Sequence, residues 1–143
     1  MEREILYRGK ATNRDIGYHR TRYKNGDWVY GLVTRLYDEH FENLPAEMTN
    51  TAGVSGIEVD YKTIGQYTGL TDKNGVKIFE GDVVSTQYGR LCVVIWHQTD
   101  CHCGWDLYPV NDEHKPPSKW CAFNSDCLEV VANLHDNPEM LKG

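Results

Sequence analysis

The stretch VDYKTIGQYTGLTDKNGVKIFEGDVV, residues 59–84, carries the strongest structural signals in the chain. Its first half alternates apolar and polar side chains, which is typical of one bent strand or of two half-buried strands. In the tetrapeptide DKNG, Asp72 can bind the backbone two residues on, and Asn74 and Gly75 tolerate positive φ. Gly81 then marks a sharp entry into the next strand. The spacing fits neither a calcium loop nor a phosphate-binding loop, so the stretch predicts a tight hairpin followed by a strand.

The same period of two continues on both sides of this stretch. Short apolar runs such as DWVYGLVTRLY, RLCVVIWHQ, WDLYPV and CLEVVANLH are separated by Gly, Asn, Asp and Pro. We therefore predict a mainly β protein: an N-terminal β-sheet subdomain over residues 1–78, and over 79–143 a small SH3-like barrel subdomain with a C-terminal tail. The barrel is expected to have five strands within residues 80–135. Helix is expected only over 37–44 and in a short C-terminal helical turn that starts at Pro138.

Alternation within the second subdomain indicates which side chains fill its core. Positions 91, 93 and 95 are all apolar, as are positions 128 and 130. Residues that alternate along a strand point to the same face of the sheet. The expected barrel core therefore holds Val83, Val93, Ile95, Leu128 and Val130.

Composition and charge narrow the class of protein. The chain has 143 residues, a net charge of −6 and five irregularly spaced cysteines. No apolar run is long enough to span a membrane, and the N-terminus lacks a signal-peptide pattern, so we expect a cytoplasmic protein without a disulfide framework. Residues 1–35 hold eight Lys/Arg and four Asp/Glu, or +4, whereas residues 36–143 hold seven and seventeen, or −10. This asymmetry has two explanations. Residues 1–35 could bind a local anionic partner, or the charges of both segments could simply be solvated.

The stretch 59–84 strongly resembles the YopX family of phage and prophage proteins. The segments REILYRGK, NGDWVYGLV and CLEVVANLHDNPEML resemble the beginning and the end of the same family. Two departures are an expansion over ATNRDIGYHRTRYK and the tetrapeptide VVAN in place of a family isoleucine-glycine-asparagine. The resemblance implies a mostly β fold with an SH3-like C-terminal part, in the cytoplasm of a bacterial host. It implies no activity, catalytic residue or cofactor.

The segment HQTDCHCGWD, residues 97–106, is the best candidate for chemistry. His97, Cys101 and Cys103 carry ligand types that zinc prefers, but the single-residue spacing of the two cysteines differs from a zinc knuckle. We therefore expect no metal and no cofactor. A metal-dependent hydrolase would have to use the acidic and histidine side chains of the same region, namely Asp100, His102, Asp106 and His114. No known catalytic motif accompanies them, and we expect no enzyme activity.

Aromatic and basic residues are interleaved between residues 14 and 30. Tyr23 lies among four cations of this segment, which are Arg14, Arg20, Arg22 and Lys24. Such a pattern can stack bases and contact phosphates. Alternatively, Trp28 and Tyr30 share a buried face of one strand while the arginines line an exposed loop.

A second aromatic set falls on the expected barrel strands: Trp96, Trp105, Tyr108 and Trp120. Any of these that lie outside the core would form a groove for a peptide, as in SH3-like domains. We therefore expect a non-catalytic binding module whose partner is a protein. Nucleic acid is the alternative partner, and a metal-dependent hydrolase is the third possibility.

Overall fold

The structure is a computed structural model in which strands dominate, and the described residues contain helix only in two short 3₁₀ segments. It describes residues 4–12, 23–36, 46–87, 89–98, 100, 103–110 and 125–142. The mainly β fold predicted from the sequence is confirmed. The helix expected over 37–44 lies outside the described residues. No helix of the described part is long and apolar enough to cross a membrane.

The chain divides into two compact units, Met1–Gln66 and Tyr67–Gly143. The division falls inside one long strand, β4, rather than at the boundary expected between residues 78 and 79. The reason is the hairpin formed by the end of β4 and β5. Tyr67 pairs with Phe79, and the fully buried Ile78 belongs to the core of the second unit. The hairpin therefore folds with the residues that follow it.

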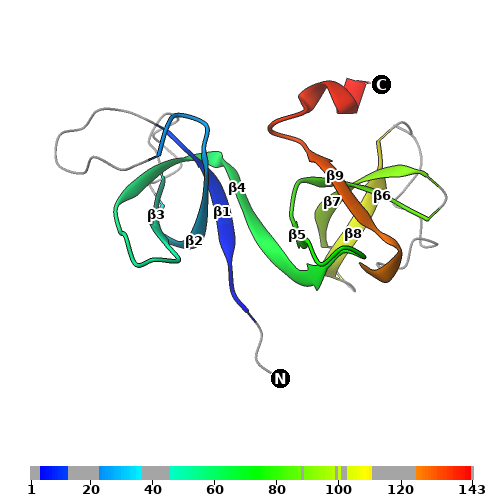
Figure 1. Cartoon of the computed structure of the whole chain (residues 1–143), viewed down its shortest axis with the longest axis horizontal. Helices are drawn as coiled ribbons and strands as arrows, with labels where there is room; N and C mark the ends of the chain where they lie inside the picture. The colour runs from blue at the N-terminus through cyan, green and yellow to red at the C-terminus, as the bar shows by residue number, and fades with distance from the viewer. Residues whose placement is uncertain are drawn as a thin grey trace. The chain divides into compact units, whose positions relative to one another are not determined.

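In the first unit, four antiparallel strands close on themselves because β1 pairs with both β2 and β4 (Figure 1). The strands are β1 (Tyr7–Ala11), β2 (Trp28–Arg35), β3 (Ala46–Asn50) and β4 (Ile57–Thr71). Their inward side chains form one core of Ala11, Val29, Ala46, Met48, Ile57 and Val59. The ring is tight at Gly31, where an added Cβ would lie 1.9 Å from the Thr49 carbonyl oxygen. Only glycine lets β2 approach β3 this closely.

The second unit holds the β4–β5 hairpin and a four-stranded antiparallel sheet in the order β8-β7-β6-β9 (Figure 1). Its elements are β5 (Lys77–Phe79), β6 (Asp82–Ser85), β7 (Leu91–Gln98), β8 (Cys103–Pro109), η1 (Ser125–Cys127), β9 (Glu129–Asn133) and η2 (Pro138–Lys142). The helical turn expected at Pro138 is confirmed. The SH3-like barrel stays a prediction, because the described residues after 79 form four strands in one sheet.

Both faces of this sheet are packed, which the alternation did not predict. One face carries Val84, Cys92, Val94, Leu107 and Val130, and Ile78 of β5 and Leu128 pack with them. The other carries Val83, Val93 and Val110, with Ile95, Leu134 and Met140 against them. The five predicted core residues are all at least partly buried. They divide between the two faces instead of forming one core.

The DKNG turn is tied to a distant strand by one buried carboxylate. Oδ1 of Asp72 accepts hydrogen bonds from the backbone N–H groups of Asn74 (2.8 Å) and Val76 (2.9 Å). Oδ2 accepts one from the N–H of Val130 (2.9 Å), 58 residues further along the chain. Gly75 has φ +82°, as the turn prediction requires. The turn therefore fastens the hairpin to β9 as well as reversing the chain.

The pKa of Asp72 is lowered in the folded protein. Burial raises it, but the N–H donors of Val130, Val76 and Asn74, together with the charge of Lys73, lower it by more. The carboxylate is therefore ionised at neutral pH, and its bonds to the backbone are charge-assisted. The Asp72 carboxylate therefore has a structural role in the DKNG turn that requires no ligand.

Candidate functional site

Trp96 and Trp105 form an aromatic pair across β7 and β8. They are directly opposite in the register, with ring centroids 5.0 Å apart and ring planes at 75°. Trp105 packs against the core of its unit, whereas Trp96 is 46% exposed. The outer ring is therefore held edge-to-face against an anchored one, which restricts its rotamers. Both residues belong to the candidate groove of the sequence analysis, and the groove itself stays a prediction.

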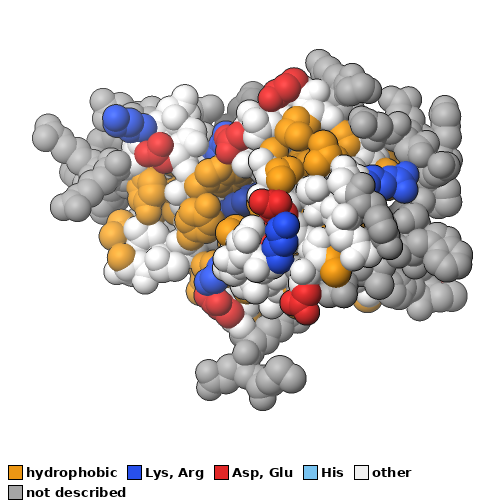
Figure 2. Space-filling view, turned by 45° about the vertical axis from the view of Figure 1, so that its right-hand side comes forward, with side chains coloured by type: hydrophobic (Ala, Val, Ile, Leu, Met, Phe, Trp, Pro, Cys, Tyr) orange, Lys and Arg blue, Asp and Glu red, His pale blue; other side chains and the backbone are white. Residues whose placement is uncertain are grey.

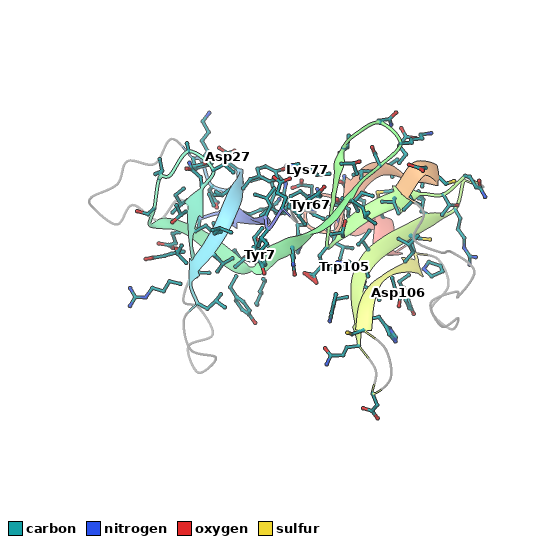
Figure 3. All side chains as sticks on the ribbon, turned by 90° about the horizontal axis from the view of Figure 1, so that it is seen from below. Tyr7, Asp27, Tyr67, Lys77, Trp105 and Asp106 are labelled. Carbon is teal, nitrogen blue, oxygen red and sulfur yellow. The ribbon has the colours of Figure 1, made fainter. Side chains whose placement is uncertain are left out.

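The other members of the predicted groove do not join this pair. Tyr108 is opposite Val93 in the register, so its side chain lies on the opposite face from Trp105 and Leu107. Trp120 lies outside the described residues. Figure 3 labels Trp105 and its neighbour Asp106 on β8, whose side chains leave the strand on opposite sides. The observed aromatic surface is thus Trp96 with Trp105, which we call the Trp96–Trp105 surface.

The candidate metal ligands are dispersed in the part of the chain that the structure describes. Nδ1 of His97 lies 3.9 Å from Oδ2 of Asp106. Cys103 is a free, exposed cysteine at the start of β8, and Cys101 lies outside the described residues. Among the described residues, no group of three or more His, Cys, Asp or Glu side chains is close enough to hold a metal ion.

The basic aromatic segment is only partly described, because Arg14, Arg20 and Arg22 lie outside the described residues. Tyr23 packs against the core of the first unit, and its hydroxyl oxygen accepts a hydrogen bond from the Asn50 side-chain amide at 3.0 Å. Lys24 is exposed, and its backbone N–H donates to Asp27. Tyr23 therefore has a packing role that the sequence reading of this segment did not foresee.

A second aromatic surface lies on the outside of the first unit. Val29 points into the core, so Trp28 and Tyr30 point outward and do not share a buried face. The guanidinium carbon of Arg8 lies 4.5 Å from the Trp28 ring centroid, and Nζ of Lys10 lies 5.3 Å from it. Alternation along β2 was the signal for this outward direction. Val29 and Gly31 flank Tyr30 and are both buried, so Tyr30 points to the opposite face. Figure 2 shows hydrophobic side chains at the surface in separate patches, with Lys and Arg side chains beside some of them.

One known protein family matches most of the chain. The family described as YopX protein matches residues 32–142. No curated protein matches the chain. Among solved structures, the crystal structure of protein EF1440 from Enterococcus faecalis is 23% identical, covers 98% of this chain and 99% of its own, and superposes with a TM-score of 0.48. Since the family match spans well over half of the sequence, including the whole of 59–84, the chain belongs to the YopX family.

Proposed function

We propose that this YopX protein is a cytosolic, phage- or prophage-type binding module without catalytic activity, and that it recognises a protein partner. The observation that supports this proposal is the Trp96–Trp105 surface. Trp96 is 46% exposed although its ring is large and apolar, and it rests on Trp105, which is anchored in the core. Exposed tryptophan is the side chain most enriched among the residues that dominate binding energy at protein interfaces. Because the ring is already held in place, little conformational entropy is lost on binding.

The charge of the second unit indicates the chemistry of the partner. Residues 67–143 hold six Lys/Arg and eleven Asp/Glu, for a net charge of −5. A segment with Lys or Arg beside an apolar or proline anchor would complement this charge and pack its anchor on the rings. We therefore favour a basic peptide segment of a protein as the occupant.

A capture experiment with matched variants tests this proposal. Wild-type protein, Trp96→Ala and Val131→Ala would each be immobilised and exposed to lysate of a lysogenic or infected host. The captured protein would then be purified and titrated against all three. Val131 is 47% exposed in the same unit, so its variant controls for the loss of an exposed apolar side chain.

We expect Val131→Ala to bind like wild type and Trp96→Ala to bind roughly 30-fold more weakly, which corresponds to about 2 kcal/mol for an interface hot spot. Melting curves would establish that Trp96→Ala is folded. Equal affinity of all three proteins for the captured partner would refute a role for this surface.

The alternatives make different predictions. Nucleic-acid binding by residues 14–30 would use Tyr23 together with Arg14, Arg20, Arg22 and Lys24. Of these, Tyr23 has its ring and hydroxyl engaged within the first unit. A metal-dependent hydrolase relies on Asp106, which faces His97 at 3.9 Å. Hydrolysis of a phosphodiester or ester substrate that requires added Zn²⁺ or Mn²⁺, and that is lost in Asp106→Asn, would replace our proposal with the enzyme.

A further inference from the structure

The outward side chains of β1 and β2 form a cation-aromatic surface in the first unit. Arg8 is opposite Tyr30 in the register, and Lys10 is opposite Trp28. We call these four residues and Leu32, which continues the same face of β2, the β1–β2 outer face. Tyr30 is 41% exposed and Leu32 is 50% exposed. Side chains at positions 28, 30 and 32 of one strand line one face, so this is a continuous apolar stripe edged by cations.

The two cations are positioned by the fold. The pairing of β1 with β4 shifts register between Arg8 and Lys10, and such an irregularity re-aims side chains. The backbone N–H of Lys10 donates to Oγ1 of Thr63 at 2.8 Å, and that hydroxyl donates to the carbonyl of Asp60 at 2.6 Å. Arg8 is only 6% exposed and lies over the Trp28 ring. Arg8 therefore contacts the Trp28 ring as a buried side chain, and Lys10 is the cation of this pair that is partly exposed.

We propose that the β1–β2 outer face binds single-stranded nucleic acid. Tyr30 offers a ring for stacking an unpaired base, Leu32 extends the apolar contact, and Lys10 is the cation for a neighbouring phosphate. A cation beside an aromatic ring on a strand face complements a polymer in which bases and phosphates alternate. The net charge of +4 over residues 1–35 favours the same class of ligand.

Acidic neighbours restrict what this face accepts. Asp27 is exposed beside Trp28, and Asp60 is opposite Lys10 on β4. Duplex DNA presents phosphates with its bases stacked inside, so it would meet these carboxylates without gaining contact with Tyr30. Specificity for single strands follows from this difference. The β1–β2 outer face belongs to the first unit and shares no residue with the Trp96–Trp105 surface. Nucleic-acid binding and protein binding can therefore be tested independently.

The test is fluorescence anisotropy with labelled oligo(dT), oligo(U) and a duplex, each titrated at two salt concentrations. We expect wild type to bind the single strands and to bind the duplex at least ten-fold more weakly. Tyr30→Ala should weaken single-strand binding by roughly five-fold or more, since one stacked base contributes that much. Lys10→Gln should reduce the slope of log affinity against log salt by about 0.7, the value for one phosphate contact on a single strand.

Two control variants lie off this face. Val54→Ala removes an exposed apolar side chain from the same unit, and Trp96→Ala removes an aromatic ring from the second unit. Both should bind the single strands like wild type. Absence of single-strand binding would overturn the proposal. So would equal affinity for single strands and duplex, or single-strand binding that Tyr30→Ala leaves unchanged.

Discussion

Replacing Asp72 by asparagine removes one negative charge and changes one of the three hydrogen bonds that the carboxylate accepts. The asparagine oxygen can still accept from the N–H groups of Asn74 and Val76, as Oδ1 does in the native turn. Its amide NH₂ then occupies the position of Oδ2 and faces the N–H of Val130. Two donors meet where a charge-assisted bond existed, so the variant keeps the local turn and loses the bond to Val130. The bond from the Lys73 N–H to the Leu128 carbonyl at 3.0 Å remains.

The expected cost follows from this geometry. Asp72 is 5% exposed, so the Val130 N–H cannot readily exchange its lost partner for water. A buried donor without an acceptor costs about 1–3 kcal/mol, and we expect Asp72→Asn to lower the free energy of unfolding by about 2 kcal/mol. Asp72→Ala loses all three bonds and should cost about 3 kcal/mol, because the exposed N–H groups of Asn74 and Val76 can be hydrated. Loss of the local turn bond alone would cost about 1 kcal/mol.

The stability difference between wild type and Asp72→Asn should become smaller at acidic pH. The folded-state pKa of Asp72 lies below the unfolded value of about 3.9, since the backbone donors outweigh burial. The stability contributed by ionisation is therefore fully present above about pH 4 and is lost as the pH falls through the lower, folded-state pKa. Urea unfolding of wild type and Asp72→Asn should show a constant difference between pH 7 and 5. The difference should narrow in more acidic solution.

Amide hydrogen exchange gives a local readout, because Val130 should exchange faster in Asp72→Asn. The matched control is Asp100→Asn, which removes the same charge from an exposed position and should change stability by less than about 0.5 kcal/mol. If Asp72→Asn is no less stable than this control, or if the Val130 amide stays protected, the carboxylate does not fasten β9 to the hairpin.

Three further predictions concern backbone geometry and the thiols. Gly75→Val should lower the free energy of unfolding by about 1–2 kcal/mol, because Gly75 has φ +82°, and Gly75→Asn should lower it by less. Melting temperatures compare the two variants, and equal losses would argue against backbone strain at this position. Gly31→Ala should cost about 3 kcal/mol, because the new Cβ meets the Thr49 carbonyl at 1.9 Å, and wild-type stability would contradict the tight closure. Protein purified without added metal should hold no stoichiometric zinc and should titrate five thiols after denaturation. Bound zinc at one ion per chain would implicate Cys103 and His97 and overturn this expectation.

The local parts of the fold could be predicted from the sequence because local chemistry determines them. Asn74–Gly75 specifies a reversal within four residues, and the observed positive φ at Gly75 follows from it. The tie from Asp72 to Val130 could not be predicted, because it depends on where a strand 58 residues away is placed. Long-range pairing of this kind leaves no periodic signal in the chain.

Burial on two faces explains why the core prediction was incomplete. Alternation identified Val93 and Ile95 on one face of β7, but Cys92 and Val94 are fully buried on the other. The uninterrupted apolar run LCVVIW was the relevant signal, since a strand covered on both sides needs no polar face. The candidate groove residues were grouped only because they fall on expected strands, and the sequence could not supply the register of β7 and β8. That register sets Trp96 opposite Trp105 and places the Tyr108 ring on the other face of the sheet.

The closure of the first sheet by β1 has a practical consequence for trimming this protein. The family match begins at residue 32, inside β2, so it leaves out β1 and the first half of β2. A fragment cut at that limit would keep β3 and β4 while removing the strand that joins the two ends of the ring. The cut would uncover Met48 and Val59 and leave unpaired strand edges, which favour aggregation. Poor solubility of such a fragment would reflect the missing strand rather than the intrinsic behaviour of the protein.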